Sequence, residues 1–331
     1  MLKQLFKRHV FYCFLLLFLL LSFYSERNLL AQNSSGNNQV LPMLLPQVVQ
    51  NKGKFYLISQ GNSEGFRKQF NIPDSGKVLQ SNLIIYEFIP HGAILKRLFE
   101  TEVTRSFFGA CMVANKIYIA GGYDENWKPT KSVFEYDLDT KKWEDKNDMF
   151  IARTNFALEN VAGKIYAIGG ENTKGSIEIY KPASDLWELV DTKFIPAQLK
   201  PIEKITASAV IEDKVYLLGN SGATFQIFTP QQSLLSEGSL SPVKSDYFDI
   251  LIINKKLYIA GGIKQTGIDD GVYLYDAVEG VWSFVGRIPL PRFGSGLATF
   301  GNMIIYMGGS TTDFTKGVKP NNEIYLYRPT K

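Results

Sequence analysis

Three arginines occupy one recurring position in the chain and could bind a carboxylate. Arg105, Arg153 and Arg292 each lie eleven residues before the position that matches Lys116 in an apolar phrase that returns along the sequence. The planar fork of a guanidinium donates paired hydrogen bonds to a carboxylate, such as that of a sugar acid or of an acidic partner loop. The same group can instead pair with a nearby Asp or Glu, or with backbone carbonyls, and tie parts of the fold together. The sequence leaves both interpretations open.

Aromatic, acidic and amide side chains follow several of these phrases and complete the set of candidate ligand-binding residues. Tyr123 and Trp127 could stack on a sugar ring or a partner side chain, or could form a structural cap. Glu125, Glu171 and Glu203 are conceivable acid or base groups beside the arginines. The remaining candidates are Asn172, Asp269 and Phe314.

The chain is poor in the residues that common catalytic and metal sites need. Its only histidines are His9 and His91, and its only cysteines are Cys13 and Cys111. No pair of histidines has metal-site spacing, and no run of carboxylates has the spacing of an EF-hand. We therefore expect no metal and no cofactor, and serine–histidine hydrolysis is improbable. No catalytic residue can be assigned.

The first 31 residues have the pattern of a secretory signal peptide. A basic start precedes an uncharged run from Phe11 to Tyr24, which is short for a bilayer core that needs about 20 helical residues. Cleavage after Ala31 would leave residues 32–38 as a polar linker, whereas an uncleaved run would anchor the chain in a membrane. We expect an exported protein that is periplasmic, secreted or at the cell surface.

Net charge gives no reason to expect a nucleic-acid partner. The whole chain has 36 Lys and Arg against 32 Asp and Glu. Removing residues 1–31 takes away four of the basic and one of the acidic side chains, which leaves a net charge of +1. A nearly neutral chain lacks the basic surface that a phosphate backbone attracts. We expect no nucleic acid, and no membrane contact apart from the export signal.

One short phrase recurs along the chain and organises it. In residues 116–122 it begins with Lys, alternates apolar residues around a Tyr and ends in two glycines. Further copies, some of them degenerate, start at Lys54, Lys164, Lys214, Lys256 and Ile304. The steps between the glycine positions are 62, 48, 50, 42 and 47 residues. A repeat of this length predicts stacked equivalent units rather than one irregular core.

Each unit contains four strand-like pieces joined by close turns. In the second unit they are residues 107–114, 117–121 and 133–137, followed by a piece that begins at Trp143. Tyr136 lies seven residues before Trp143, and the same spacing returns in other units, which suits large rings packed between neighbouring units. Four strands in an antiparallel meander form the blade of a propeller.

The double glycine, the Tyr and Trp seven apart and the Arg before the first strand resemble kelch repeats. The resemblance implies an all-β, six-bladed kelch-type propeller over residues 39–331. The blades are expected at about residues 47–103, 104–151, 152–198, 199–243, 244–290 and 291–331. The last unit lacks a fourth strand, so we predict that residues 39–46 complete it and close the ring, where Pro42 is tolerated on an outer strand.

Loops of two kinds should fall on opposite faces of this ring. The turns after first and third strands are near-minimal, whereas the loops after second strands and between blades are longer and differ from unit to unit. Variable loops on a rigid scaffold usually carry binding residues, so we predict the site on their face. The three arginines precede inner strands on this face and should point toward the mouth of the central channel.

The leading hypothesis is an exported binding module that recognises a protein or a glycan through this face. A related possibility is an adhesion or scaffold domain whose insertion at residues 61–80 makes the contact. The alternative is an enzyme that resembles sialic acid (N-acetylneuraminate) mutarotases, because exported bacterial six-bladed kelch proteins of about this length include them. Mutarotation needs only an acid or base and a carboxylate anchor. A closed ring leaves few free strand edges, so we expect a monomer.

Overall fold

The computed structural model describes residues 28–30, 43–61, 63–72, 82–90, 94–191, 199, 202–219, 222–301, 303–320 and 323–327. The predicted linker and the predicted signal peptide apart from residues 28–30 lie outside these ranges. Among the described residues, none of the helices combines the length and the apolar character that crossing a membrane requires.

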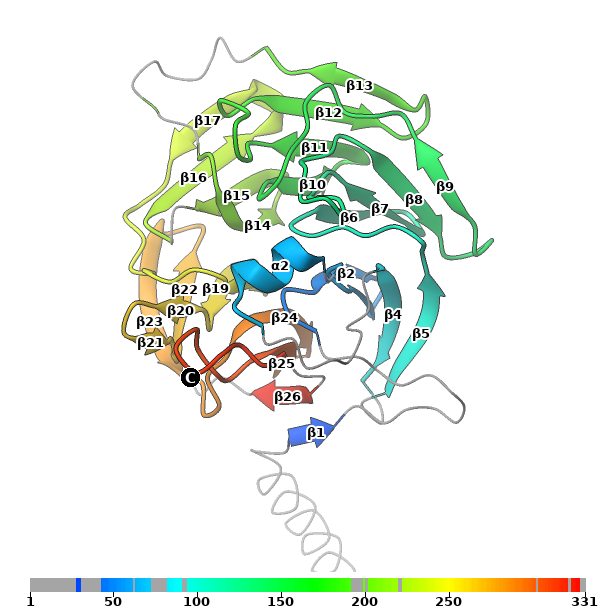
Figure 1. Cartoon of the computed structure of the whole chain (residues 1–331). Coiled ribbons are helices and arrows are strands. Elements are labelled where there is room, and N and C mark those ends of the chain that lie inside the picture. The colour runs from blue at the N-terminus through cyan, green and yellow to red at the C-terminus, as the bar shows by residue number, and fades with distance from the viewer. Residues whose placement is uncertain are drawn as a thin grey trace, which may run out of the picture.

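The strands form six four-stranded sheets that are arranged as blades around a central axis (Figure 1). Three of the blades come from residues 47–189. The first contains β2 (Gln47–Asn51), β3 (Lys54–Ile58), β4 (Ile84–Ile89) and β5 (Ile94–Glu100). The second contains β6 (Gly109–Val113), β7 (Lys116–Ala120), β8 (Val133–Asp137) and β9 (Trp143–Lys146). The third contains β10 (Ala157–Val161), β11 (Lys164–Ile168), β12 (Ile177–Lys181) and β13 (Leu186–Leu189).

The other three blades repeat this order. The fourth contains β14 (Ile205–Ile211), β15 (Lys214–Gly219), β16 (Thr224–Thr229) and β17 (Leu234–Glu237). The fifth contains β18 (Asp249–Ile253), β19 (Lys256–Ala260), β22 (Gly271–Asp276) and β23 (Val281–Arg287), with a small hairpin of β20 (Ile263–Lys264) and β21 (Gly267–Ile268). The sixth contains β24 (Phe293–Phe300), β25 (Met303–Ser310), β26 (Glu323–Tyr327) and β1 (Asn28–Leu30). The prediction of a six-bladed propeller is confirmed.

The recurring aromatic pairs lie directly opposite each other on the third and fourth strands of their blades. Tyr136 faces Trp143 across β8 and β9, and Tyr180 faces Trp187 across β12 and β13. Neighbouring blades share apolar clusters; one of them combines Tyr180 and Trp187 with Tyr118 of the preceding blade. The period of two along each strand sends successive side chains to the two faces of a blade, and both faces are covered by neighbours. The core is therefore a ring of clusters between blades.

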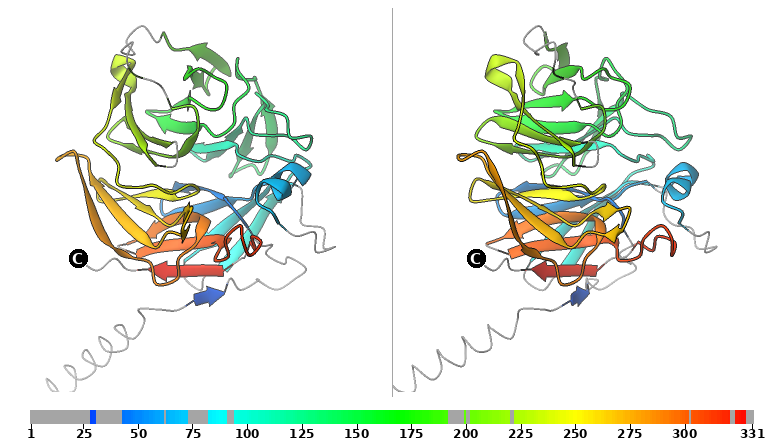
Figure 2. Two further views of the ribbon diagram at one scale, coloured as in Figure 1. Left: turned by 60° about the vertical axis from the view of Figure 1, so that its left-hand side comes forward. Right: turned by 90° about the vertical axis from the view of Figure 1, so that its left-hand side faces the viewer.

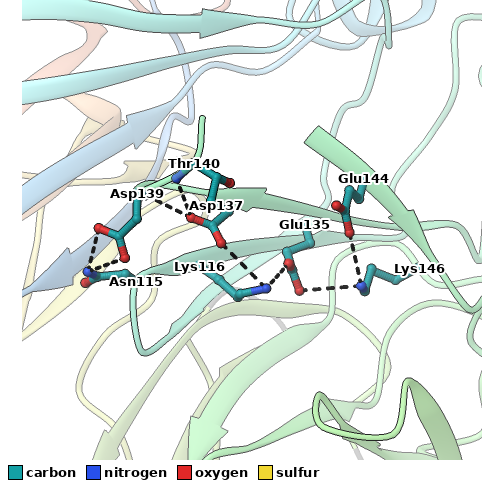
Figure 3. Close-up of polar contacts among 8 residues, drawn as sticks. All are labelled: Asn115, Lys116, Glu135, Asp137, Asp139, Thr140, Glu144 and Lys146. Atoms are coloured by element: carbon teal, nitrogen blue, oxygen red, sulfur yellow. Dashed lines mark hydrogen bonds and ion pairs between the residues drawn. The ribbon is translucent and has the colours of Figure 1, made fainter. Parts of the chain in front are cut away.

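Lysines at the start of second strands pair with carboxylates on third strands. Figure 3 shows Lys116 of β7 beside Glu135 and Asp137 of β8, with Lys146 of β9 also 3.8 Å from Glu135. Glu135 is only 3% exposed, so these two ammonium groups compensate the charge that burial would otherwise penalise. The recurring lysine therefore helps to stabilise the blade in which it lies.

The outer strand of the sixth blade is β1, which pairs antiparallel with β26 from Asn28 opposite Tyr325 to Leu30 opposite Glu323. The prediction that residues 39–46 supply this strand is wrong for the described part, residues 43–46, and residues 39–42 lie outside the described ranges. The carbonyl of Met43 instead accepts a hydrogen bond from the amide of Gly309, 2.8 Å away, at the start of the first blade. The carbonyl of Arg153 accepts the amide of Gly122 in the same way. Met43 therefore occupies the position in the first repeat that Arg153 occupies in the third.

Candidate binding face

A short helix, α2 (Glu64–Gln69), rises from the insertion between β3 and β4. Ser63 caps its N-terminus, because its Oγ accepts a hydrogen bond from the amide of Phe66. Glu64 and Lys68, one turn apart, form an exposed ion pair of 2.7 Å. Residues 61–65 match the G-x-S-x-G pattern of serine hydrolases, but Ser63 is buried and its hydroxyl oxygen is engaged in capping the helix.

The apolar side of α2 covers one end of the central channel. Figure 1 shows the helix across the middle of the ring, and Figure 2 shows it on the same side of the ring as the loop after β25. Phe70, at the end of the helix, is fully buried, and its ring centre lies 6.0 Å from that of Phe107, 5.1 Å from Tyr247 and 6.1 Å from Phe314. These partners come from three other blades. The loop face is therefore closed at its centre by an aromatic cluster.

Tyr123 and Trp127 belong to this cluster and do not project freely from their loop. Their rings stack in parallel with centres 4.4 Å apart. Trp127 also contacts the backbone of α2, where a Cβ added to Gly65 would lie 2.4 Å from the indole. Phe107 meets the Trp127 ring edge-on at 6.1 Å. The geometry thus favours the structural cap over a stacking platform for a sugar.

Glu171 links the second blade to the third at this face. Its carboxylate accepts hydrogen bonds from the Tyr123 hydroxyl at 2.9 Å and from the Asn155 amide at 3.0 Å. Glu125 and Asn172 are exposed on neighbouring loops. The structure therefore brings Tyr123, Trp127 and Glu171 together, places Phe314 against Phe70, and leaves Glu125 and Asn172 at the surface.

Arg153 is completely buried and all its contacts lie within the fold. Its guanidinium donates to Glu178 at 2.9 Å and to the carbonyls of Gly169 and Ser176 at 2.6 and 2.8 Å. Burial lowers the pKa of this guanidinium, and the Glu178 carboxylate opposes that effect. The carbonyl of Arg153 accepts the amide of Gly122, 2.7 Å away in the preceding blade. One residue thus joins two blades.

The same geometry explains the double glycine. Gly121 and Gly122 have φ angles of 62° and 87°, which favour glycine. A Cβ on Gly121 would lie 2.6 Å from the Arg153 carbonyl, so the close approach of the two blades also requires the absence of a side chain.

Arg292 and Arg105 repeat this arrangement with different partners. Arg292 is 1% exposed and donates to the Gly308 carbonyl at 3.0 Å and to Glu323 at 3.3 Å. Arg105 donates to Ser132 at 2.8 Å and lies over the ring of Phe134. None of the three arginines is among the residues that line the central channel. The structure therefore favours the interpretation in which they tie blades together.

Asp269 is also held within the fold. Its carboxylate accepts the Ser245 hydroxyl at 2.5 Å and pairs with Lys264 at 2.8 Å. Ser245 occupies the position of the arginines in its own repeat, so a hydroxyl and a carboxylate replace the guanidinium there. Across the described ranges, no group of three or more His, Cys, Asp and Glu side chains is placed to hold a metal ion.

The central channel contains polar residues that the sequence analysis missed. A cavity of about 490 Å³ runs along the first strands of all six blades and is lined by Glu159 and Asp249, among others. Burial raises the pKa of both carboxyls to about 7. The available sequence signal was an acidic residue inside an otherwise apolar first strand, as in residues 249–253.

Comparison with known proteins agrees with the repeat structure. The family model for the kelch motif matches residues 104–150 and 152–193. These ranges cover the second and third blades, including Arg105, Arg153 and two of the Tyr–Trp pairs. The protein is a kelch-repeat β-propeller.

Similar kelch proteins come from animals and poxviruses. Kelch-like protein 35 of Mus musculus is 22% identical over 62% of this chain and 35% of its own length. Kelch repeat and BTB domain-containing protein 1 of camelpox virus is 23% identical over 63% of this chain and 38% of its own. Kelch-like protein 25 of Xenopus tropicalis is 21% identical over 62% and 37%. This propeller therefore spans less than two fifths of the length of these curated relatives.

Proposed function

We propose that this kelch propeller is a recognition module that binds a protein partner through the face around α2. The observation that carries the proposal is the closed aromatic cluster, in which loops from several blades pack against Phe66 and Phe70. This packing gives a continuous surface with charged side chains around it rather than an open small-molecule pocket. Kelch propellers are typical protein-binding modules, which supports the same assignment.

The proposal includes export. The uncharged run from Phe11 to Tyr24 behind a basic start is the support for it, because such a run directs chains into the secretory route. Cell fractionation of the full chain would test this part alone. Recovery with the cytosolic fraction would contradict export and leave the binding proposal standing.

The geometry gives less support to a glycan or a sugar acid as the ligand. A carboxylate anchor needs a guanidinium that can reach the ligand, whereas Arg153 and Arg292 are 0% and 1% exposed and bonded within the propeller. Stacking on a sugar needs an open aromatic face, whereas Trp127 packs against Tyr123 and α2. We therefore place the sialic acid mutarotase-like alternative second, and catalysis behind binding.

Lysine-directed crosslinking in the cells that produce the protein tests the proposal. Both faces carry exposed lysines, so the chain contains its own control. Crosslinks to a partner are expected at the loop-face lysines Lys68, Lys128, Lys174 and Lys316. Lysines of the turn face, Lys52, Lys142 and Lys255, should give few or none. A partner crosslinked mainly through the turn face would overturn the assignment.

A charge-reversal series would then measure the contribution of the face. Lys68→Glu and Glu125→Lys change exposed groups of the loop face, whereas Lys142→Glu is a matched change on the turn face. We expect the first two to weaken binding of the crosslinked partner several-fold, because charges at a binding rim act on association. Equal affinities for all three variants would contradict the proposed face.

A further inference from the structure

The central channel is a second concave region, separate from the loop face. Its end near α2 is walled by buried aromatic residues, including Phe108, Phe156 and Phe248. Its other end reaches Gln50, which is exposed, and Asn160 and Thr299, which are half-buried. The cavity is therefore accessible from the turn face. A volume of about 490 Å³ lies within the range of small-molecule sites, about 300–1,000 Å³.

Two carboxyl groups from different blades line this cavity. Glu159 of β10 accepts a hydrogen bond from the Ser208 hydroxyl, 2.6 Å away in the fourth blade. Asp249 of β18 accepts the backbone amide of Leu297, 2.7 Å away in the sixth blade. No ion pair to either carboxyl occurs among the described residues. Both groups thus have fixed positions and no cation.

The other charged and titratable groups of the lining leave the cavity acidic. Asp246 lies at the α2 end, and so does Lys204, whose ammonium lies over the Tyr247 ring at 5.2 Å from its centre. Cys111 adjoins Glu159, and burial raises the pKa of its thiol well above the ordinary value. Lys204, the one ammonium group of the described lining, is therefore held at the closed end, away from Glu159 and Asp249.

The two carboxyls are separated along the channel by apolar wall. Asp249 and Ala157 hold equivalent positions in their blades. The residues opposite them on the second strands, Ala260 and Ile168, each immediately precede a double glycine. Glu159 lies two residues further along its strand, which places it about 7 Å nearer the turn face than Asp249. Leucines at positions 158, 251 and 297 line the same stretch. Two acceptors with methyl groups between them match a chain of methylenes with an ammonium at each end.

We propose that the channel binds a small organic diamine, with one ammonium at Glu159 and the other at Asp249. An ammonium group has three donors and no acceptor, so it suits a carboxylate beside hydroxyls and free strand-edge carbonyls. A bare divalent metal ion fits less well, because the described residues offer no cluster of three metal-binding side chains. This site is independent of the loop-face proposal.

Calorimetric titration of the full-length protein with 1,3-diaminopropane, putrescine, cadaverine and butylamine tests the proposal. At pH 8 at least one diamine should bind, and it should bind more tightly than the monoamine. Glu159→Gln and Asp249→Asn should each weaken that binding at least tenfold. The matched control Glu188→Gln, an exposed carboxyl on the outer strand β13, should change it less than twofold.

Proton linkage gives a test that does not depend on the variants folding. A cation stabilises the ionised carboxyls, so binding should release protons near pH 7 and the affinity should rise at least tenfold from pH 6 to pH 8. Titration in two buffers of different ionisation enthalpy measures this release. The proposal is overturned if no diamine binds the wild type, if both channel variants bind as well as the wild type, or if binding releases no protons.

Discussion

Arg153 marks the repeat in the sequence and also joins two blades in the structure. Its carbonyl holds the preceding blade at Gly122, while its guanidinium holds Glu178, Gly169 and Ser176 of its own blade. Glu178 is itself 0% exposed, so neither charge of this pair reaches solvent. Removing one partner would leave the other charged and buried, which is far more costly than losing a surface pair.

Replacement of Arg153 should therefore unfold the propeller more easily. We expect Arg153→Ala to lower the free energy of unfolding by about 3–5 kcal/mol, because Glu178 loses its partner. The control is Arg287→Ala, which breaks the exposed pair with Asp270 and should cost about 0–1 kcal/mol. Denaturant titration of both variants gives the comparison. Similar small losses would mean that Arg153 is not a tie between blades.

The sequence patterns predicted only part of the contacts that join the blades. The position of the arginines was visible from the sequence, but their partners were not, because Glu178 lies 25 residues away and acts only once β12 is paired. Glu159 and Asp249 each gave only the weak signal of an acidic residue in a first strand, since the channel that joins them is made by six separate strands. Tertiary structure alone brings such groups together.

At the scale of elements, α2 is the feature that changes the interpretation of the loop face. A helix of six residues has little stability by itself, and packing of its apolar side must hold it in place. Phe66 and Phe70, one turn apart, supply that side and contact each other with ring centres 4.9 Å apart. Sequence analysis recognised the insertion at residues 61–80 but not the helix, because no repeat counterpart exists for it.

Gly65→Ala should loosen α2 from the loop face. The added methyl group would overlap the indole of Trp127, and overpacking of this kind costs about 1–3 kcal/mol. Amide hydrogen exchange should then rise in residues 64–70 and 124–128, while the first strands keep their protection. Lys68→Ala, an exposed change on the same helix, is the control and should leave the exchange unchanged. Unchanged exchange in Gly65→Ala would show that the contact does not hold the helix.

At the scale of the whole molecule, the ring was predictable and its closure was not. The recurring strand pattern and the Tyr–Trp spacing predicted six blades, because each unit contains the same strands and the same packing residues. The outer strand β1 lies just behind the apolar run, where the sequence predicted a signal peptide that ends at Ala31. Cleavage at that position would remove β1 and leave the edge of β26 unpaired.

Removal of β1 should lower the thermal stability of the ring. A chain that starts at Gln32 is expected to melt several degrees below one that starts at Asn28, because the ladder with β26 is lost. Thermal unfolding of the two chains makes the comparison, and N-terminal sequencing of the exported protein tells which form exists. Equal melting temperatures would show that β1 does not fasten the propeller.

The channel carboxyls should make the stability of the whole propeller depend on pH. Their folded pKa values of about 7 exceed the ordinary values of 4.5 for Glu159 and 3.8 for Asp249. The stability that they contribute is complete below the ordinary values and is lost as the pH rises toward 7. The free energy of unfolding of the double variant Glu159→Gln, Asp249→Asn should therefore rise relative to wild type between about pH 4 and pH 7. A pH-independent difference would contradict the raised pKa values.

Hydrogen exchange of the complex with the crosslinked partner tests the central claim most directly. A partner on the loop face should increase amide protection in residues 64–70, 123–128 and 311–319. The turns at residues 51–54, 139–142 and 254–256 should exchange as in the free propeller. Protection confined to those turns would contradict recognition through the face around α2.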